Sequence, residues 1–482
     1  MSRINSNQSS LQAIHKLFAN QKDLSLRLER LSSGLRINRG VDDPAGLIAS
    51  ESLRSELRGI GQAIENSTRA INVIATADAA LSEVSKLLLD IRGLINKSAN
   101  EGALSSTEIQ ANQLQIDSLL ESIDRISNTT QFNGKKLLNG ELSYITSGVN
   151  SADLSRVQIF GARVPVGNPL PVVVAVTQSA QTARVNLLAG GGTGLSASGY
   201  LSAGNNVTIQ IRGLLGTESF SFGGGTANSA IRNTVNAFTS LTGVSAALSG
   251  NALTFNSTAF GSDAFVSVTA TSGTFGISGG DSGATLDKGR DAGVTINGQA
   301  ATVKGLFASV RSNGLDVALD LSTAFGTRIG SSTFQVTGGG AQFQIGPNVN
   351  TDGLVSVGLP SINITNLGSA VEGYLNTLKT GSTNSIVGGR YVQAEAIVNA
   401  AIEQVSVFSG RLGGFQRNQL DTNINTRQVA FENVQAAESA IRDADYAAEV
   451  ASLTRAQILV QSTTQILSIA NSSPQAVLSL LR

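Results

Sequence analysis

The sequence predicts a multidomain α + β protein whose two chain ends form long antiparallel, coiled-coil helices around an inserted β-rich middle. Residues 1–140 and about 390–482 carry apolar residues at helical spacing, whereas residues 141–375 are rich in Gly, Thr, Ser and Val in short alternating runs. The length agrees with several domains, because 482 residues are about three times the ~150 of an average domain.

The composition excludes most catalytic and metal-binding classes. The chain has no Cys, which removes disulfides, thiol nucleophiles, iron–sulfur clusters and Cys-based zinc sites. Its single His, His15, leaves neither a His-rich metal site nor a His-dependent triad, and we expect it to be a solvent-facing or seam residue of the first helix. No run reaches the ~20 apolar residues that span a bilayer. We expect no enzyme, no cofactor, no metal and no membrane insertion.

Charge gives no general attraction to nucleic acid or membrane, because 34 basic and 34 acidic residues cancel. Residues 1–40 are locally basic, but their charges alternate with leucines and Phe18 is their only aromatic residue. We therefore favour a solvent-facing helix surface there over a nucleic-acid or lipid site. The same segment lacks the apolar block of a secretory signal, so we expect export without a cleaved signal peptide.

Residues 1–40 form the first predicted helix, an N-terminal coiled-coil segment. Its leucines recur every seven residues or step by four and three, which is the a/d spacing of a left-handed coiled coil. The positions expected to pack against another helix or subunit are Leu17, Leu24, Leu28, Leu31 and Leu35.

Residues 41–140 form the predicted N-terminal core helices. Asp42, Asp43 and Pro44 indicate a helix start, because acidic caps precede a proline whose missing N–H costs nothing there. An apolar stripe then continues to Ile95, which predicts a helix on the order of 80 Å long at 1.5 Å per residue. A capping box at residues 105–108 starts the next helix, and residues 131–134 end it in a turn.

The C-terminal end repeats this pattern. Residues 376–440 contain a core helix in which Val398, Val405 and Leu412 recur by sevens, and residues 441–482 form a second coiled-coil segment. The packing positions of that second segment are Val450, Leu453, Val460 and Leu467. Because one apolar stripe per helix needs a covering helix, we expect the two chain ends to pair. We also expect the first and last 35 residues to stay unfolded until a larger lattice covers them.

The middle, residues 141–375, is predicted to form one or two small β-rich outer domains, with candidate modules at about 200–280 and 290–350 and one short helix at 227–238. The turns at 249–251, 297–298 and 313–314 indicate hairpins, since Asn-Gly favours type I′ turns. The glycine run at 190–194 lacks the setting of a phosphate loop and is predicted to be a plain loop. Residues 279–281 with Asp287 resemble a calcium loop only loosely, and we expect a surface turn.

Several strings resemble one family, the bacterial flagellins. At the N-terminal end these are LSSGLRIN at residues 31–38, DDPAGL at 42–47 and TQFNGKKLL at 130–138. At the C-terminal end they are RLG at 411–413 followed by QRN at 416–418, IRDADYA at 441–447 and SPQAVLSLLR at 473–482. The strings occur in the family's order and cover both ends, somewhat under half of the chain.

The resemblance implies a subunit that is exported unfolded and polymerises beneath a cap at the tip of an extracellular flagellar filament. It implies inner tubes built from the paired terminal helices, and a variable, outward-facing middle. The partners that it implies are other copies of the chain, a flagellar secretion chaperone that binds the C-terminal region, the filament cap and the hook-junction proteins. Filament symmetry, supercoil form and glycosylation of Ser and Thr in 141–375 are not fixed by the sequence.

One stretch departs from the family. Flagellins that the vertebrate toll-like flagellin receptor detects usually carry an Arg and a Glu just before the Ser-Ala-Asn that is here residues 98–100. The matching positions are Asp90, which reverses the charge, and Gly93, which removes the Glu, while Arg92 and Leu94 remain. We therefore predict weak activation of that receptor.

Three other functions were weighed against a filament subunit. A hook–filament junction protein has similar chain ends but is present in few copies, and matches at both extreme ends favour the filament subunit. A secreted adhesin that binds glycans through the β-rich middle is less favoured. A flagellin with a metalloprotease insert needs His-Glu-x-x-His, which the single His excludes.

Overall fold

The structure is a computed structural model that describes residues 7–164, 168–187, 199–250, 252–279, 285–312, 314–369 and 372–480, with side chains to residue 472. The predicted loop at 190–194, the turn residues Asn251 and Asn313, and residues 280–281 of the calcium-like stretch lie outside the described residues. Two compact units make up the chain. The first is Met1–Ser67, Ile345–Gly353 and Thr422–Arg482, and the second is Thr68–Gln344 and Leu354–Asp421.

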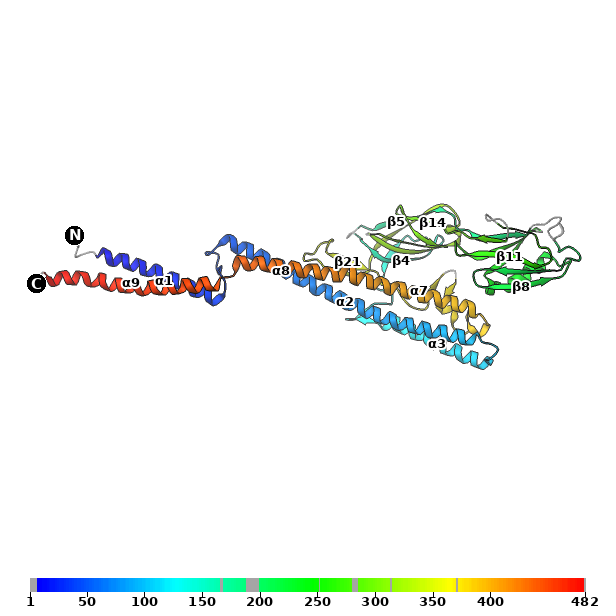
Figure 1. Ribbon diagram of the computed structural model, residues 1–482, viewed down its shortest axis with the longest axis horizontal. Helices are drawn as coiled ribbons and strands as arrows, with labels where there is room; N and C mark the ends of the chain where they lie inside the picture. The colour runs from blue at the N-terminus through cyan, green and yellow to red at the C-terminus, as the bar shows by residue number, and fades with distance from the viewer. Residues whose placement is uncertain are drawn as a thin grey trace. The chain divides into compact units, whose positions relative to one another are not determined.

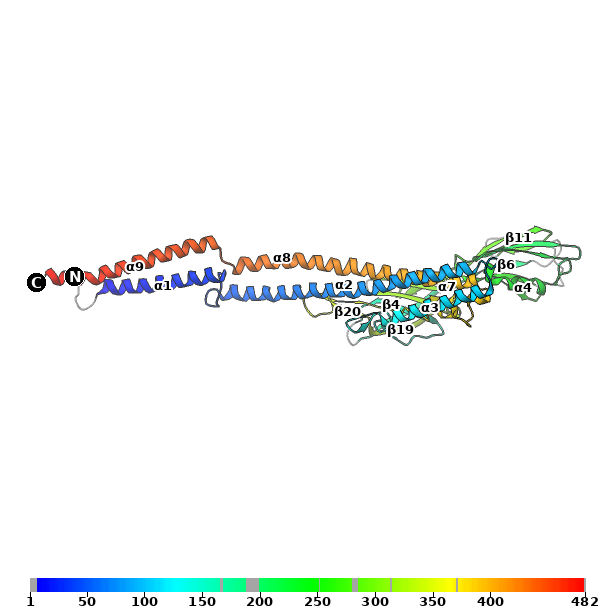
Figure 2. The same ribbon diagram turned by 90° about the horizontal axis from the view of Figure 1, so that it is seen from below.

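The first unit contains α1 (Gln8–Ser33) and α9 (Tyr446–Leu480), which lie side by side in both views (Figures 1 and 2). Their polar contacts fix an antiparallel arrangement. Near the start of α1, Asn7 Nδ2 donates to the carbonyl of Ala470 at 2.7 Å, and further along, Asn20 Nδ2 donates to the carbonyl of Leu459 at 3.4 Å. The two chain ends therefore pair with each other, as the stripes predict.

The seam between α1 and α9 follows a heptad on each helix. On α1 the heptad positions of the seam, all buried or half-buried, are Ser10, Ala13, Leu17, Asn20, Leu24, Arg27 and Leu31. On α9 they are Glu449, Leu453, Ala456, Val460, Thr463, Leu467 and Ala470. Two predicted packing positions lie off this seam, since Leu28 is 49% exposed and Val450 is 36% exposed. The 3-4 step from Leu24 reaches Arg27 rather than Leu28, and the step back from Leu453 reaches Glu449 rather than Val450.

The two chain segments that leave α1 and enter α9 also pair. Leu35 and Asp443 form an antiparallel bridge, the Arg36 N–H donates to the Arg442 carbonyl at 2.7 Å, and the Ala444 N–H donates to the Gly34 carbonyl at 2.9 Å. Gly34 ends α1 with φ of 73°, a left-handed conformation that glycine adopts without a Cβ penalty.

The helix α2 (Pro44–Ser98) begins at the proline of the predicted helix start. The two aspartates before it, Asp42 and Asp43, accept hydrogen bonds from different backbone groups. Asp43 Oδ1 accepts from the Gly46 N–H at 2.9 Å and caps the helix, whereas Asp42 Oδ2 accepts from the N–H groups of Asn38 and Arg39 and closes the preceding loop. These backbone donors, Arg39 first, lower the pKa of Asp42.

Long helices also form part of the second unit. With 55 residues, α2 is about 80 Å long, and its last 31 residues lie in this unit. The helix α3 (Ser106–Thr129) starts with the predicted capping box of Ser105 and Glu108. On α7 (Tyr391–Phe415) the buried residues include the predicted Val398, Val405 and Leu412. The seam residues of α2 and α3 in this unit are Ile74, Leu81, Val84, Leu88, Ile91, Ile95, Ile116, Leu120 and Ile123.

A π-helical turn, η3 (Gln416–Asp421), joins α7 to α8 (Thr422–Arg442). The buried residues of α7 step by three and four up to Phe415, but the next buried residue is Leu420, five positions later. A π turn places one extra residue in the helical turn, so it moves the buried face by one position. This shift is not among the features predicted from the sequence, although the spacing from Phe415 to Leu420 indicates it.

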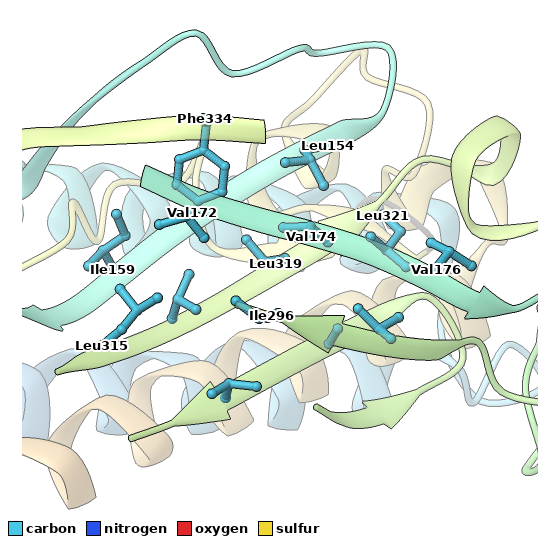
Figure 3. Packing of buried hydrophobic residues seen from close by; sticks show 14 of the residues in the cluster. Leu154, Ile159, Val172, Val174, Val176, Ile296, Leu315, Leu319, Leu321 and Phe334 are labelled. Carbon is cyan, nitrogen blue, oxygen red and sulfur yellow. The ribbon is translucent and has the colours of Figure 1, made fainter. Parts of the chain in front are cut away.

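Two β modules make up the rest of the second unit. The first pairs its strands in the orders β15-β14-β5-β19-β3 and β16-β17-β18-β4, and both sheets contribute to one core. Figure 3 shows Val172, Val174 and Val176 of β5 meeting Leu319 and Leu321 of β18. Its strands are β3 (Tyr144–Ser147), β4 (Leu154–Ala162), β5 (Leu170–Gln178), β14 (Gly293–Ile296), β15 (Gln299–Ala300), β16 (Thr302–Lys304), β17 (Phe307–Arg311), β18 (Leu315–Leu321) and β19 (Gly330–Gly339).

The second β module is inserted into the first. Its strands lie between β5 and β14, which pair directly with Val176 opposite Val294. The buried residues Ile231 and Val235 of its helix α4 (Asn228–Ala237) join a core of their own with the two sheets β12-β6-β10-β9 and β13-β11-β7-β8. Its other elements are β6 (Thr182–Leu187), β7 (Val207–Arg212), β8 (Thr217–Phe222), α5 (Thr239–Thr242), β9 (Val244–Ser249), β10 (Ala252–Phe260), β11 (Phe265–Ser272), β12 (Ile277–Gly279) and β13 (Leu286–Lys288).

These cores differ from the modules expected at 200–280 and 290–350. The first β module needs β3, β4 and β5 from residues 144–178 as well as the strands after 290, and the second begins at β6 rather than near 200. The reason is long-range pairing, because β18 pairs with β4 and β19 with β5 across more than a hundred residues. The alternation of apolar and polar residues along one strand does not show which distant strand pairs with it.

Short elements complete the described chain. The predicted turn at 131–134 is a hairpin of β1 (Gln131–Phe132) and β2 (Lys135–Lys136), with positive φ at Asn133 and Gly134. The Asn297-Gly298 turn joins β14 to β15 in the same way. The remaining elements are α6 (Thr323–Gly326), β20 (Ala341–Gln344), β21 (Leu354–Val357), β22 (Gly368–Ser369), β23 (Gly373–Tyr374) and the 3-10 turns η1 (Leu375–Leu378) and η2 (Ile386–Gly388).

Candidate functional site

The candidate site is the set of Leu, Ile and Phe side chains on α1 and α9 that the α1–α9 seam leaves in solvent. Phe18 is 66% exposed on α1, and Ile469 is 68% exposed on α9. We call this set the terminal apolar surface. Its members are Leu11, Phe18, Leu28, Ile458, Leu459, Ile466 and Ile469.

This surface has a clear energetic consequence. Burying one Leu, Ile or Phe side chain is worth about 1.5–3 kcal/mol, so seven of them make a substantial driving force for association. Soluble monomers rarely keep large apolar patches in water, and such patches mark interaction sites. A pair of helices buries only one stripe on each, and Phe18 and Ile469 lie outside that stripe.

An ion cluster lies on the α1–α9 seam beside this surface. Arg27 Nη1 donates to both carboxylate oxygens of Glu449 at 3.2 and 3.1 Å, and Arg30 Nη1 donates to Oε1 at 3.2 Å. The Glu449 side chain is only 10% exposed. The hydrogen bond to Glu449 is the largest factor that raises the pKa of Arg27. This cluster fixes which turn of α1 faces which turn of α9.

The predicted packing residues divide between the seam and the solvent. Leu17, Leu24, Leu31 and Leu35 are half-buried, and Leu28 belongs to the terminal apolar surface. The half-buried positions on α9 are Leu453, Val460 and Leu467, whereas Val450 is exposed. Arg27 and Glu449 are not among the predicted residues, although their heptad positions indicate the pair, since a charge at a seam position needs an opposite charge.

A shallow groove of 770 Å³ runs between α2 and α3, and it contains most of the predicted receptor-epitope positions. Asp90, Gly93 and Leu94 line it from α2, and Leu114 lines it from α3. Arg92 does not line the groove, because its Nη1 lies 3.5 Å from Asn399 Oδ1 on α7. Asp90 and Gly93 are both exposed, so the two departures from the family pattern lie on the surface.

His15 and Asp287 are the residues considered for catalysis and metal binding. His15 is exposed on α1, and Asp287 is buried with its carboxylate accepting the Arg184 N–H at 2.6 Å. Within the described ranges no cluster of three His, Cys, Asp or Glu side chains is placed to hold a metal ion. The helices in the described part of the chain are all too short or too polar to cross a bilayer.

Comparison with known sequences assigns both helical ends to one family. Residues 4–143 match the bacterial flagellin N-terminal helical region, and residues 396–481 match the bacterial flagellin C-terminal helical region. The chain belongs to the bacterial flagellin family. The two matched regions contain α1, α2 and α3 at one end and most of α7 to α9 at the other, and the β modules lie outside them.

Individual flagellins are similar to the chain over different lengths. Flagellin B of Helicobacter pylori is 29% identical over 100% of this chain and 99% of its own length. The flagellin of Bacillus subtilis is 44% identical, but over 29% of this chain and 46% of its own length. Among solved structures, a flagellar hook-associated protein of Legionella pneumophila is 13% identical, covering 81% of this chain and 98% of that one, with a TM-score of 0.31.

Family membership makes the chain a structural subunit of the bacterial flagellar filament, and the family is one of structural proteins. The terminal apolar surface belongs to the helices that define the family. The candidate functional site of this flagellin is therefore the terminal apolar surface.

Proposed function

We propose that copies of this flagellin assemble by packing the terminal apolar surface of one copy against α1 and α9 of its neighbours. The observation that carries the proposal is the exposure of Phe18 and Ile469 on helices whose other face is already used by the α1–α9 seam. Water-exposed apolar side chains on two adjacent helices favour a further layer of helices around them.

The geometry of such contacts favours a filament over a closed ring. Ile458 and Leu459 are successive residues of α9 and so point to different sides of a helix with 3.6 residues per turn, which gives a copy more than one apolar side to offer to its neighbours. Contacts between two different surfaces of the same protein propagate without closing when the rotation between copies does not return to the start. An open helical polymer follows, and the β modules are then free to project from it.

We further propose that α1 and α9 become ordered only on assembly. Their seam is poor in apolar area, because Ser10, Asn20, Arg27 and Thr463 occupy seam positions between the leucines. Two helices with such a seam bury too little surface to offset the loss of chain entropy. Neighbouring copies supply the missing area, so folding of the ends is coupled to polymerisation.

Export and partner binding are proposed on the same surface. The exposed Ile458, Leu459 and Ile466 of α9 offer an apolar helix face to a flagellar secretion chaperone before export. The filament cap and the hook-junction proteins are proposed to contact the assembled subunits. We propose an extracellular location reached without a cleaved signal peptide, and intact protein mass of the secreted chain tests this last point.

Polymerisation of full-length variants tests the assembly proposal. The double variant F18S/I469S removes two exposed apolar side chains without touching the seam, and I329S is the matched control, since Ile329 is 75% exposed on the first β module. Light scattering after seeding, with electron microscopy of the product, is expected to show long filaments for the wild type and I329S and few or none for F18S/I469S. Normal filaments from F18S/I469S would contradict the proposal. Long filaments from wild-type monomers also distinguish this function from a junction protein of few copies.

A further inference from the structure

Two hairpins of the second unit form a natural matched pair. The turn between β1 and β2 contains Asn133 with φ of 49° and Gly134 with φ of 79°, and the turn between β14 and β15 contains Asn297 with φ of 49° and Gly298 with φ of 78°. Both asparagines are exposed, and a Cβ at either glycine would meet no atom within 4 Å. The two sites share the same dipeptide, backbone conformation and access to water.

The two asparagine side chains differ in how they are held. Asn297 Oδ1 accepts from the Val173 N–H at 2.8 Å, and its Nδ2 donates to the Pro171 carbonyl at 3.4 Å, so β5 holds both ends of the amide. The side chain of Asn133 makes no hydrogen bond within the described part of the chain. A third asparagine that precedes glycine, Asn139, is half-buried, and its Oδ1 accepts from the Glu141 N–H at 3.1 Å.

This difference matters for a spontaneous reaction of Asn-Gly sequences. The glycine nitrogen attacks Cγ of the asparagine, the N–Cγ bond forms as the Cγ–Nδ2 bond breaks, and ammonia leaves with the glycine proton. Water then opens the resulting five-membered succinimide at one of its two carbonyls and gives aspartate or isoaspartate. The side chain must rotate so that Cγ approaches the glycine nitrogen, and a hydrogen-bonded amide resists that rotation.

We propose that, of the three asparagines that precede glycine in the described residues, Asn133 is the one at which the folded chain spontaneously deamidates, and that Asn297 is protected by its hydrogen bonds to β5. The product adds one negative charge beside the exposed Lys135 and Lys136. Isoaspartate also adds one backbone carbon to a hairpin whose register places Phe132 opposite Lys135. The hairpin leads into Leu137, whose N–H donates to the Thr130 carbonyl at 3.0 Å, so the modification loosens the chain where α3 ends.

Peptide mass spectrometry of aged full-length protein tests the proposal. After incubation at about pH 8.5, trypsin releases residues 126–135 with Asn133 and residues 291–304 with Asn297. In the folded protein we expect the rise of one mass unit at Asn133, located by fragmentation, to be at least tenfold faster than at Asn297. In denaturing urea the deamidation rates at Asn133 and Asn297 are expected to agree within about twofold, because only the local sequence determines the rate in an unfolded chain.

Variants and controls make the outcome decisive. N133Q is expected to remove the reaction from residues 126–135, because glutamine forms a six-membered ring much more slowly, and it leaves the Asn297 rate unchanged. Equal rates at Asn133 and Asn297 in the folded protein would overturn the proposal. So would a rate ratio that is the same in urea as in buffer, since the hydrogen bonds to β5 would then play no part.

Discussion

The Arg27 guanidinium lies between α1 and α9 with its Nη1 3.1 Å from Oε2 of Glu449. The two residues are 422 positions apart in the sequence, and their side chains are 25% and 10% exposed. Arg30 shares the same carboxylate at 3.2 Å. One acidic side chain on the last helix thus holds two basic side chains of the first helix, which sets the register between the chain ends.

Substitution of Glu449 by glutamine is expected to weaken this pairing. E449Q removes the anion that Arg27 and Arg30 share and leaves Arg27 with Asp23, at 3.2 Å, which costs about 1–3 kcal/mol. Because each 1.4 kcal/mol is tenfold in an equilibrium constant, the critical concentration for polymerisation is expected to rise about 5- to 140-fold. Sedimentation of polymer at a series of monomer concentrations measures it.

The control for E449Q is E83Q on α2. Glu83 forms an exposed i,i+3 pair with Lys86 at 3.1 Å, and such surface pairs contribute about 0–1 kcal/mol. A critical concentration that rises no more for E449Q than for E83Q would show that the Arg27–Glu449 pair does not set the register.

Both faces of α1 are expected to matter for assembly. L24A shortens a seam side chain, whereas F18S changes a side chain that only a neighbouring copy can cover. Because the ends are proposed to be unfolded in the monomer, neither variant should change the circular dichroism of the monomer. Each should raise the critical concentration by the cost of its lost burial, about 1.5–3 kcal/mol for F18S. A loss of monomer helix in either variant, or a wild-type critical concentration for F18S, would contradict this.

Hydrogen exchange is expected to reveal the coupling of folding to assembly. Amides in the first and last 35 residues should exchange within seconds in the monomer, because their seam buries little apolar surface. In the polymer the same amides should be protected by several orders of magnitude, while those of α7 and of the β cores are protected in both states. Strong protection of α1 and α9 in the isolated monomer would mean that the ends fold before they meet a neighbour.

Much of the helical architecture could be predicted from the sequence, because the residues that a helix buries recur at regular short spacings along the chain. The recurrence of Val398, Val405 and Leu412 by sevens gives the buried face of α7 directly, and Pro44 marks where α2 begins. The candidate surface was only partly predicted. Leu28 and Val450 are apolar and near the seam in sequence, and only the geometry of the pair shows that both face solvent.

The β modules and the π turn were harder for a physical reason. Strand alternation shows which residues face a core, but not that β5 pairs with β14 and β19 at once. The insertion of the second β module between β5 and β14 is therefore invisible to local patterns. The spacing of Phe415 and Leu420 indicates the one-residue shift of the buried face at η3. A search for heptads that allows gaps does not detect it.

Acid is expected to act on a loop junction of the second unit through Asp291. Burial alone would raise the pKa of this carboxyl, but hydrogen bonds from the Ser262 hydroxyl and from the N–H groups of Gly305 and Ser262 bring it below its ordinary value. A lowered pKa means that the carboxylate contributes stability above pH ~3.9, the unfolded value, and loses it as the pH falls through the folded value.

The variant D291N measures this contribution. At pH 6 it should lower the stability by about 1–2 kcal/mol, and the difference from the wild type should shrink below about pH 4. Asp316 and Asp320, whose pKa values burial raises, change in the opposite direction, but both proteins share them and they cancel in the difference. Thermal unfolding at a series of pH values gives the curve. A difference that stays constant down to pH 2 would remove Asp291 from the acid response.

Weak activation of the vertebrate toll-like flagellin receptor is the last expectation, and it rests on two positions in the α2–α3 groove. Asp90 presents a negative charge where detected flagellins usually carry Arg, and Gly93 presents no side chain where they usually carry Glu. Both are exposed, and a Cβ at Gly93 meets nothing within 4 Å, so D90R/G93E fits the helix without repacking. Replacing a mid-helix glycine also stabilises α2 by about 0.5–1 kcal/mol. In a reporter-cell assay D90R/G93E should raise the response at least tenfold, whereas K86R on the same helix should leave it unchanged. A wild-type response as strong as that of an enterobacterial flagellin would refute the expectation.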